Sequence, residues 1–328
     1  MIGRRLDDRY TLGERIGAGG FGQVFLARDT KMDRDVAIKV VRDEGEPAHL
    51  ARLLREARVL AGIRHPNIVY ILDVGDDYIV MERLTGPNLL TFVRPRLPLP
   101  VDEAASYGVA LAGALTVLHD RPDPIVHRDI KLENIMLDGE RGRQQVKLVD
   151  FGLAAAPNLT RVTQIGVVIG TPGYLAPERR DGLPGGPPSD VYALGVTLHV
   201  LLSGSMPVAA DASSGRAARS LAQLRPALPP GLADLVDRML AADPAVRPGA
   251  AEVRDALAGV GGARVAAEAL ASRLAGQFTE IQVQFGQGRE ALAAFALVRL
   301  LARAGAELGS DHSLVRRIRA YADLRRTP

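Results

Sequence analysis

The sequence predicts an α+β protein of two lobes: a small antiparallel β lobe with one helix, a large mainly helical lobe, and a helical C-terminal extension. Three observations predict this fold class. Short β-branched runs fill the first 85 or so residues, apolar residues then recur at helical spacing, and an Ala/Arg-rich stretch closes the chain. A chain of 328 residues suits two domains or one large bilobal domain. We therefore divide it into 1–84, 85–261 and 262–328.

Composition and charge exclude several functional classes. The apolar fraction of 47% and the charged fraction of 24% are globular averages, which excludes disorder of the whole chain. The absence of cysteine excludes disulfides, thiolate metal sites and a cysteine nucleophile. A net charge of +3 gives no strong field for nucleic acid, so no such partner is expected. With no run of about 18 apolar residues and no apolar N-terminal segment, we expect no transmembrane span, no signal peptide and a cytoplasmic location.

The small lobe is expected to begin with strands joined by tight turns over residues 10–41. A helix is expected over 48–62, since Leu53, Ala57 and Leu60 recur on one helical face. Strand-like runs at 68–74 and 78–81 complete the lobe.

Helices of the large lobe are expected over 102–119, 190–203, 232–241 and 250–259. A block of strands and loops over 125–178 separates the first two of them.

The extension shows two different periodicities. One helix face is predicted from the spacing of Leu297, Leu300, Leu301, Ala304 and Leu308. A short strand is predicted where Thr279, Ile281, Val283 and Phe285 alternate with polar residues. Its role stays open among a helical extension with a solvated basic end, a homodimerisation helix, a site for an acidic partner and a peripheral membrane contact.

A glycine cluster lies between the first two long strands, at Gly17, Gly19 and Gly22, with Val24 after it. Glycines allow backbone amides to approach phosphate oxygens closely, although a plain hairpin turn fits the cluster equally well. A dinucleotide fold would need a helix after the turn, and a second strand follows instead.

Lysine is rare in this chain: 37 of the 41 basic residues are arginine, and the four lysines are Lys31, Lys39, Lys131 and Lys147. Lys39 lies within an apolar strand, where a charge is costly unless it is paired. Glu56, near the apolar face of the next helix, is the candidate partner. A solvated lysine and an ordinary helix glutamate are the alternative.

Two acidic motifs point to a magnesium site. Asp129 and Asn134 lie five residues apart in His127–Asn134, and Asp150 follows an apolar strand in an Asp-Phe-Gly sequence. Such oxygen ligands suit Mg²⁺, which takes few protein carboxylates. No His/Cys set with zinc spacing competes with this interpretation.

Three further motifs follow in order, at Gly170–Glu178, Ser189–Gly195 and Asp243–Pro248. With the preceding ones they resemble the protein kinase family over 10–258, and the pattern is similar to the bacterial eukaryotic-like (Hanks-type) serine/threonine kinases. The resemblance implies the bilobal protein-kinase fold. It also implies transfer of the γ-phosphate of ATP, with Mg²⁺ or Mn²⁺, to serine and threonine hydroxyls of protein substrates.

The same resemblance implies roles around the phosphates. Gly17, Gly19 and Gly22 would cover them, while Lys39 would hold the α- and β-phosphates and pair with Glu56 in the active state. Asp129 would accept the proton of the acceptor hydroxyl, and Lys131 would neutralise charge on the γ-phosphate. The metal would be held by Asn134 and Asp150.

A purine pocket is implied in the same way. Its roof would be Val24 and Ala37 and its floor Met136. Met81 resembles the gatekeeper residue, after which backbone groups of Glu82 and Leu84 would face the adenine.

Control and stability residues complete the resemblance. Thr171 would contact Asp129 in the acceptor pocket. Thr163, or as second choice Thr160, would be a phosphorylated threonine with Arg128 as its cationic partner. The structural residues would be Asp190, bracing the catalytic loop, and Glu178 with Arg247, forming a buried ion pair.

Two other functions, an inactive scaffold and a small-molecule phosphotransferase, fit part of the motif set. A catalytically inactive, nucleotide-binding scaffold would be expected to lack Lys39, Asp129 or Asp150, and all three are present. A small-molecule phosphotransferase would usually lack the segment that ends in Ala176-Pro177-Glu178, which favours a protein acceptor.

Overall fold

The computed structural model describes residues 1–19, 22–41, 47–139, 144–151, 172–207, 220–286, 289–308 and 313–325. These residues form two compact units, Met1–Ala258 and Gly259–Pro328. The sequence placed the corresponding boundary between 261 and 262.

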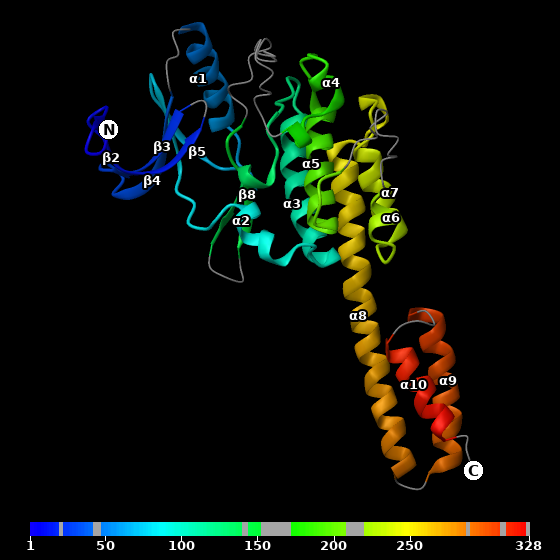
Figure 1. Cartoon of the computed structure of the whole chain (residues 1–328). Coiled ribbons are helices and arrows are strands. Elements are labelled where there is room, and N and C mark those ends of the chain that lie inside the picture. The colour runs from blue at the N-terminus through cyan, green and yellow to red at the C-terminus, as the bar shows by residue number, and fades with distance from the viewer. Residues whose placement is uncertain are drawn as a thin grey trace. The chain divides into compact units, whose positions relative to one another are not determined.

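The small lobe is an antiparallel sheet of six strands in the order β1-β2-β3-β4-β6-β5, with one helix beside it (Figure 1). The predicted β lobe is therefore confirmed. Its elements are β1 (Arg5–Leu6), β2 (Tyr10–Gly19), β3 (Gly22–Asp29), β4 (Arg34–Val41), α1 (Pro47–Ala61), β5 (Ile71–Val74) and β6 (Tyr78–Glu82).

The strand alternation gives this sheet two different faces. One face forms a closed apolar core. Its main members are Tyr10, Leu12, Phe25, Val36, Ile38, Val40, Tyr78 and Val80. The opposite face carries the residues between these positions, and it is the face on which the candidate site is built.

The large lobe follows a connector and contains one two-stranded sheet, β7 (Ile135–Asp138) with β8 (Gln145–Leu148). Its helices are α2 (Leu89–Val93), α3 (Val101–His119), α4 (Pro177–Arg180), α5 (Pro187–Ser203), α6 (Leu221–Leu224), α7 (Pro230–Met239) and the start of α8 (Ala250–Gly286). The predicted helical lobe is thus confirmed.

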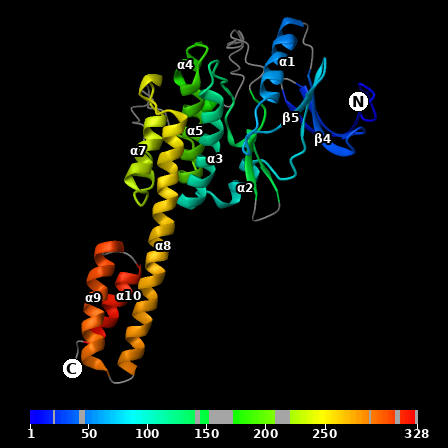
Figure 2. The same ribbon diagram turned by 180° about the vertical axis from the view of Figure 1, so that it is seen from behind.

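Helices α3 and α5 lie side by side at the centre of the large lobe, as Figures 1 and 2 both show. Every residue of α5 from Ser189 to Leu202 is buried, which explains its almost continuous apolar sequence. Among the described residues, α3 alone is long and apolar enough to cross a membrane by length and composition, a test that buried core helices also pass.

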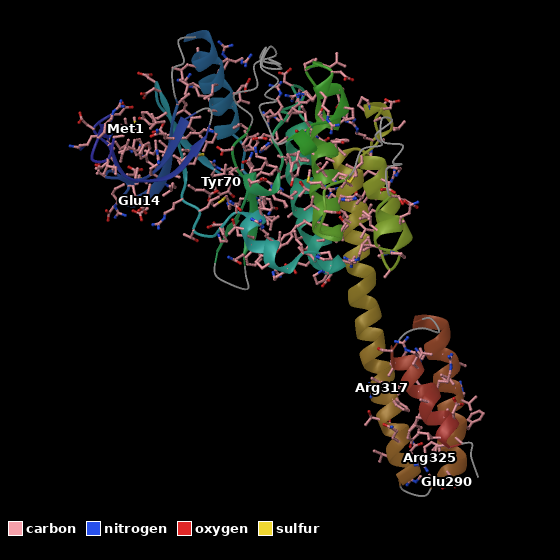
Figure 3. The ribbon with its side chains drawn as sticks, in the orientation of Figure 1. Met1, Glu14, Tyr70, Glu290, Arg317 and Arg325 are labelled. Carbon is pink, nitrogen blue, oxygen red and sulfur yellow. The ribbon has the colours of Figure 1, made fainter. Side chains whose placement is uncertain are left out.

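The second unit contains the end of α8, α9 (Glu290–Leu308) and α10 (Ser313–Leu324) around a core of its own (Figure 3). The predicted strand at 279–285 is wrong, because α8 continues to Gly286. The decisive spacing is that of Leu274, Phe278, Ile281 and Phe285, which places four large side chains on one buried helical face. Val283, which suggested alternation, is exposed.

Candidate active site

The site begins on the open face of the small sheet. Val24 pairs directly with Lys39, and Ala37 pairs directly with Met81. Directly paired residues project from the same face of a sheet, and so do residues two apart on one strand. The four side chains expected around the nucleotide therefore share one face, opposite the apolar core.

The glycine turn closes one end of this face. Gly17 pairs with Val24 and Gly19 with Gly22, while the two residues between the strands lie outside the described chain. Gly22 has a φ of +149°, and an added Cβ there would overlap the carbonyl of Val40. Only glycine fits at this position without moving β4.

Lys39 reaches across to the large lobe. Its Nζ donates to Asp150 Oδ1 at 2.8 Å, with only 13% of the lysine side chain exposed. Glu56 Oε1 lies 3.9 Å from Arg52 Nε on the same helix. The structure thus joins Lys39 to an expected metal ligand, and the pairing of Lys39 with Glu56 in an active state stays a prediction.

In the loop His127–Asn134, called the catalytic loop from here on, two side chains donate hydrogen bonds to the carboxylate of Asp129. Lys131 Nζ donates to both of its oxygens at 2.9 Å. Asn134 Nδ2 donates to Asp129 Oδ2 at 2.7 Å and to its backbone carbonyl at 2.8 Å. Asp129 keeps 43% of its side chain exposed, so a fixed, hydrogen-bond-accepting carboxylate faces solvent.

Register brings the two expected metal ligands together. Asn134 directly precedes β7, Asp150 follows β8, and Ile135 pairs with Leu148. Val149 N–H donates to Asn134 O at 3.0 Å, and this bond joins the start of β7 to the end of β8. No cluster of three or more His, Asp or Glu that would hold a metal occurs in the described part of the chain. Two oxygen ligands without such a cage suit a divalent ion that completes its shell with water and phosphate.

A buried carboxylate from the large lobe shapes the catalytic loop. Asp190 on α5 is fully buried and accepts the backbone N–H groups of His127 at 2.7 Å and Arg128 at 2.8 Å. His119 Nε2 lies 2.9 Å from the same carboxylate. These bonds tie the backbone of the loop to α5, and the bracing role of Asp190 stays a prediction.

The rings of His127 and Phe151 pack against each other, with their centroids 4.6 Å apart. Burial lowers the pKa of His127, so its imidazole is neutral at physiological pH. It serves as a packed aromatic group beside Asp129 and Asp150.

The connector between the lobes runs past β7. Met136, the expected floor of the purine pocket, forms a bridge to Asn88, and Gly86 N–H donates to Leu137 O at 3.1 Å. Glu82 ends β6, and Leu84 follows it in the connector. Glu82 Oε1 accepts a hydrogen bond from Lys147 Nζ at 2.8 Å. The sequence motifs assigned no role to Lys147.

The ion pair between Glu178 and Arg247 is bidentate. Arg247 Nη1 and Nη2 each donate to one Glu178 oxygen at 2.8 Å, and the arginine side chain is fully buried. Although burial by itself raises the pKa of the Glu178 carboxyl, hydrogen bonds from Arg247 and Ser189 lower it to about 2.

These elements occur in a known order and arrangement. Residues 10–256 match the family model described as protein kinase domain. The chain belongs to the protein kinase family. The expected protein-kinase fold is therefore confirmed, and protein kinases use ATP and a divalent metal ion.

The curated relatives of this kinase domain include bacterial serine/threonine-protein kinases. Serine/threonine-protein kinase PrkC of Bacillus subtilis is 34% identical over 257 residues, which are 74% of this chain and 39% of PrkC. PknB of Mycobacterium leprae is 40% identical over 63% of this chain and 34% of its own length. PknA of Mycobacterium tuberculosis is 35% identical, with shares of 75% and 59%. The resemblance to bacterial Hanks-type kinases is confirmed, while the match spans only about one third to three fifths of the length of these relatives.

Solved kinase structures agree. The apo form of PpkA-294 has a TM-score of 0.62 and 31% identity, and the match covers 78% of this chain and 98% of that one. Rad53 1-466 in complex with AMP-PNP has a TM-score of 0.59 and 25% identity, with coverage of 75% and 64%.

The expected regulatory threonines, Thr160 and Thr163, and the expected pocket residue Thr171 lie outside the described residues. Arg128 is described, with a φ of +68° that its bond to Asp190 fixes. Burial and the nearby Arg128 charge lower the pKa of Arg179 on α4. The charges of Arg128 and Arg179 therefore repel each other, and Arg179 is a residue that sequence motifs did not indicate.

The low pKa of Glu178 predicts acid sensitivity of the kinase domain. When the pKa of a carboxyl falls from 4.5 in the unfolded chain to about 2 in the folded one, its ionisation stabilises the fold by about 3 kcal/mol above pH 4.5. That stability is lost as the pH falls through 2. Urea unfolding between pH 7 and pH 3 should show a steeper loss for wild type than for Glu178→Gln. Equal slopes in the two proteins would contradict this assignment.

Proposed function

We propose that the chain transfers the γ-phosphate of Mg²⁺-bound ATP to serine or threonine hydroxyls of protein substrates. The observation that carries the proposal is the convergence of Lys39, Asp129, Asn134 and Asp150 from both lobes. Lys39 bonds Asp150, and Asn134 bonds Asp129. The N–H of Val149, next to Asp150, donates to Asn134 O and links the two pairs, so the expected phosphate, metal and acceptor groups form one connected set.

Each residue has a part that suits its chemistry. Lys39 and Lys131 place compact positive charges where a polyphosphate would lie. Asp129 orients the acceptor hydroxyl and takes its proton as the oxygen attacks phosphorus. Asn134 and Asp150 would hold Mg²⁺, which supplies charge neutralisation on the phosphates.

The nucleotide-binding scaffold is the second candidate, and the open carboxylate of Asp129 disfavours it. A scaffold needs no solvent-facing carboxylate clamped by both a lysine and an amide. Phosphorylation of the chain's own Thr163, or of Thr160, is part of the proposal, with Arg128 as the cationic partner that the resemblance implies.

The test is phosphate transfer by the purified chain, followed by intact mass and phosphopeptide mapping. With Mg·ATP, wild type should gain phosphate on threonine, with Thr163 as the main site, while Asp150→Asn should gain none because its metal ligand is missing. An absence of transfer to itself and to casein, despite measurable Mg·ATP binding, would favour the scaffold. Transfer without phosphate on Thr163 would remove that residue alone from the proposal.

A further inference from the structure

A buried lysine joins the interlobe connector to the strand pair of the large lobe. Lys147, on β8, is 5% exposed, and its Nζ donates to Glu82 Oε1 at 2.8 Å. The same ammonium lies 4.3 Å from the ring centroid of Tyr70. A buried charge is costly unless it is paired. In a chain with four lysines and 37 arginines, this position therefore indicates a need for a compact cation.

Glu82 is fixed at the start of the connector. Its Oε1 also accepts the backbone N–H of Tyr70 at 2.8 Å, and its own N–H donates to Tyr70 O at 3.0 Å. Figure 3 labels Tyr70 between the small sheet and the large lobe. Since side chain and backbone of Glu82 are both held, a shift of the carboxylate would shift the connector.

Lys147 is equally well placed on the other side. It pairs directly with Met136 across β7 and β8, so both side chains leave the same face of the strand pair. Leu148, next to Lys147, donates to Asn67 O at 2.9 Å and accepts from Val69 N–H at 3.0 Å. The strand that carries Lys147 is thus anchored, and its ammonium lies between the expected purine floor and the connector.

We propose that Lys147 is a positioning residue for the purine of the nucleotide. Its ion pair with Glu82 holds the connector at a fixed distance from Met136, which sets the width of the slot that the adenine enters. Lys147 itself touches no substrate. This inference rests on the proposed nucleotide-dependent function, and it assigns a role to a residue outside the catalytic motifs.

The test compares two ligands that differ in the purine. Calorimetry on the full chain measures the Kd of Mg·AMP-PNP and of magnesium tripolyphosphate for wild type and Lys147→Met. Without the ion pair the connector is no longer held in one place, so only a fraction of the molecules has the slot at its binding width, and the Kd of Mg·AMP-PNP should rise about tenfold or more. The Kd of tripolyphosphate should stay unchanged. Lys31→Met, the same exchange at an exposed lysine, should alter neither value.

A second variant separates positioning from stability. Lys147→Met leaves the Glu82 carboxylate buried without its cation, which destabilises the fold. Glu82→Gln combined with Lys147→Met removes both charges and keeps an amide oxygen for Tyr70 N–H. This double variant should recover the melting temperature of wild type yet still bind Mg·AMP-PNP about tenfold more weakly, since the connection to β8 is still missing.

The outcomes distinguish the two proposals. Unchanged Mg·AMP-PNP binding by Lys147→Met or by the double variant, beside a wild type that binds, would overturn the role of Lys147 alone. Equal weakening of both ligands would also overturn it, because the effect would not depend on the purine. A wild type that binds no nucleotide would overturn the proposed function together with this inference.

Discussion

Replacing Asp129 by asparagine is expected to lower kcat for phosphate transfer by about 10³-fold. The carboxylate is held by Lys131 Nζ at 2.9 Å and Asn134 Nδ2 at 2.7 Å, so it is oriented as a hydrogen-bond acceptor. An amide of the same shape cannot take the hydroxyl proton. Because Lys131 donates to both oxygens of the carboxylate, either orientation of the amide would also place its N–H₂ group against the Lys131 ammonium. Since 43% of the side chain is exposed, the fold should be retained.

The measurement is the initial rate on a protein acceptor at saturating Mg·ATP, with thermal melting as the check on folding. Asp123→Asn is the matched control, because Asp123 is an exposed acid just before the same loop. Activity of Asp129→Asn within a few-fold of wild type would contradict the assigned role, as would an equal loss in Asp123→Asn.

Replacing Arg247 by alanine is expected to destabilise the large lobe by about 3–5 kcal/mol. All five N–H donors of its guanidinium are used: two on Glu178 and three on the carbonyls of Pro188, Ala241 and Ala242. Alanine would leave the Glu178 carboxylate without its cation, with the Ser189 hydroxyl at 2.6 Å as its neutral side-chain donor. Three carbonyl groups would lose their donor as well.

Thermal melting at pH 7 checks this expectation, with a fall of roughly 10 °C for a domain of this size. Arg254→Ala is the matched control, because Arg254 is an exposed arginine whose partner, Asp255, is also exposed. Its melting temperature should stay within about 2 °C of wild type. An Arg247→Ala protein that melts with the control would show that the buried pair is not needed for stability.

The fold class was predictable because local patterns mark most of the elements. β-Branched runs over 10–41 and apolar residues at helical spacing in 102–119 and 190–203 each predicted the element that the structure has. The motif residues were predictable for a different reason: phosphate and metal chemistry needs particular side chains, and rare lysines mark such needs. Lys39 and Lys131 were found in this way.

What the sequence did not predict correctly depends on long-range contacts or on the longer helical spacing of the extension. Lys147 carried the same signal of rarity as Lys39, but its significance depends on the bridge between Leu148 and Ile68, which brings β8 near the end of β6. The partner of Lys39 depends on how α1 and the Asp150 segment lie, which spacing does not determine. In the extension, alternation over 279–285 was misleading, since the longer helical spacing of Phe278 and Phe285 decides the element.

Asp190 gives the catalytic loop an unusual kind of rigidity. Its carboxylate accepts hydrogen bonds from the backbone N–H groups of His127 and Arg128. These bonds do not involve the side chain of Asp129. To release those amides, the first turns of α5 would have to leave a fully buried environment. The loop therefore opens to solvent only when the core of its lobe opens, so its local unfolding free energy approaches that of the lobe as a whole.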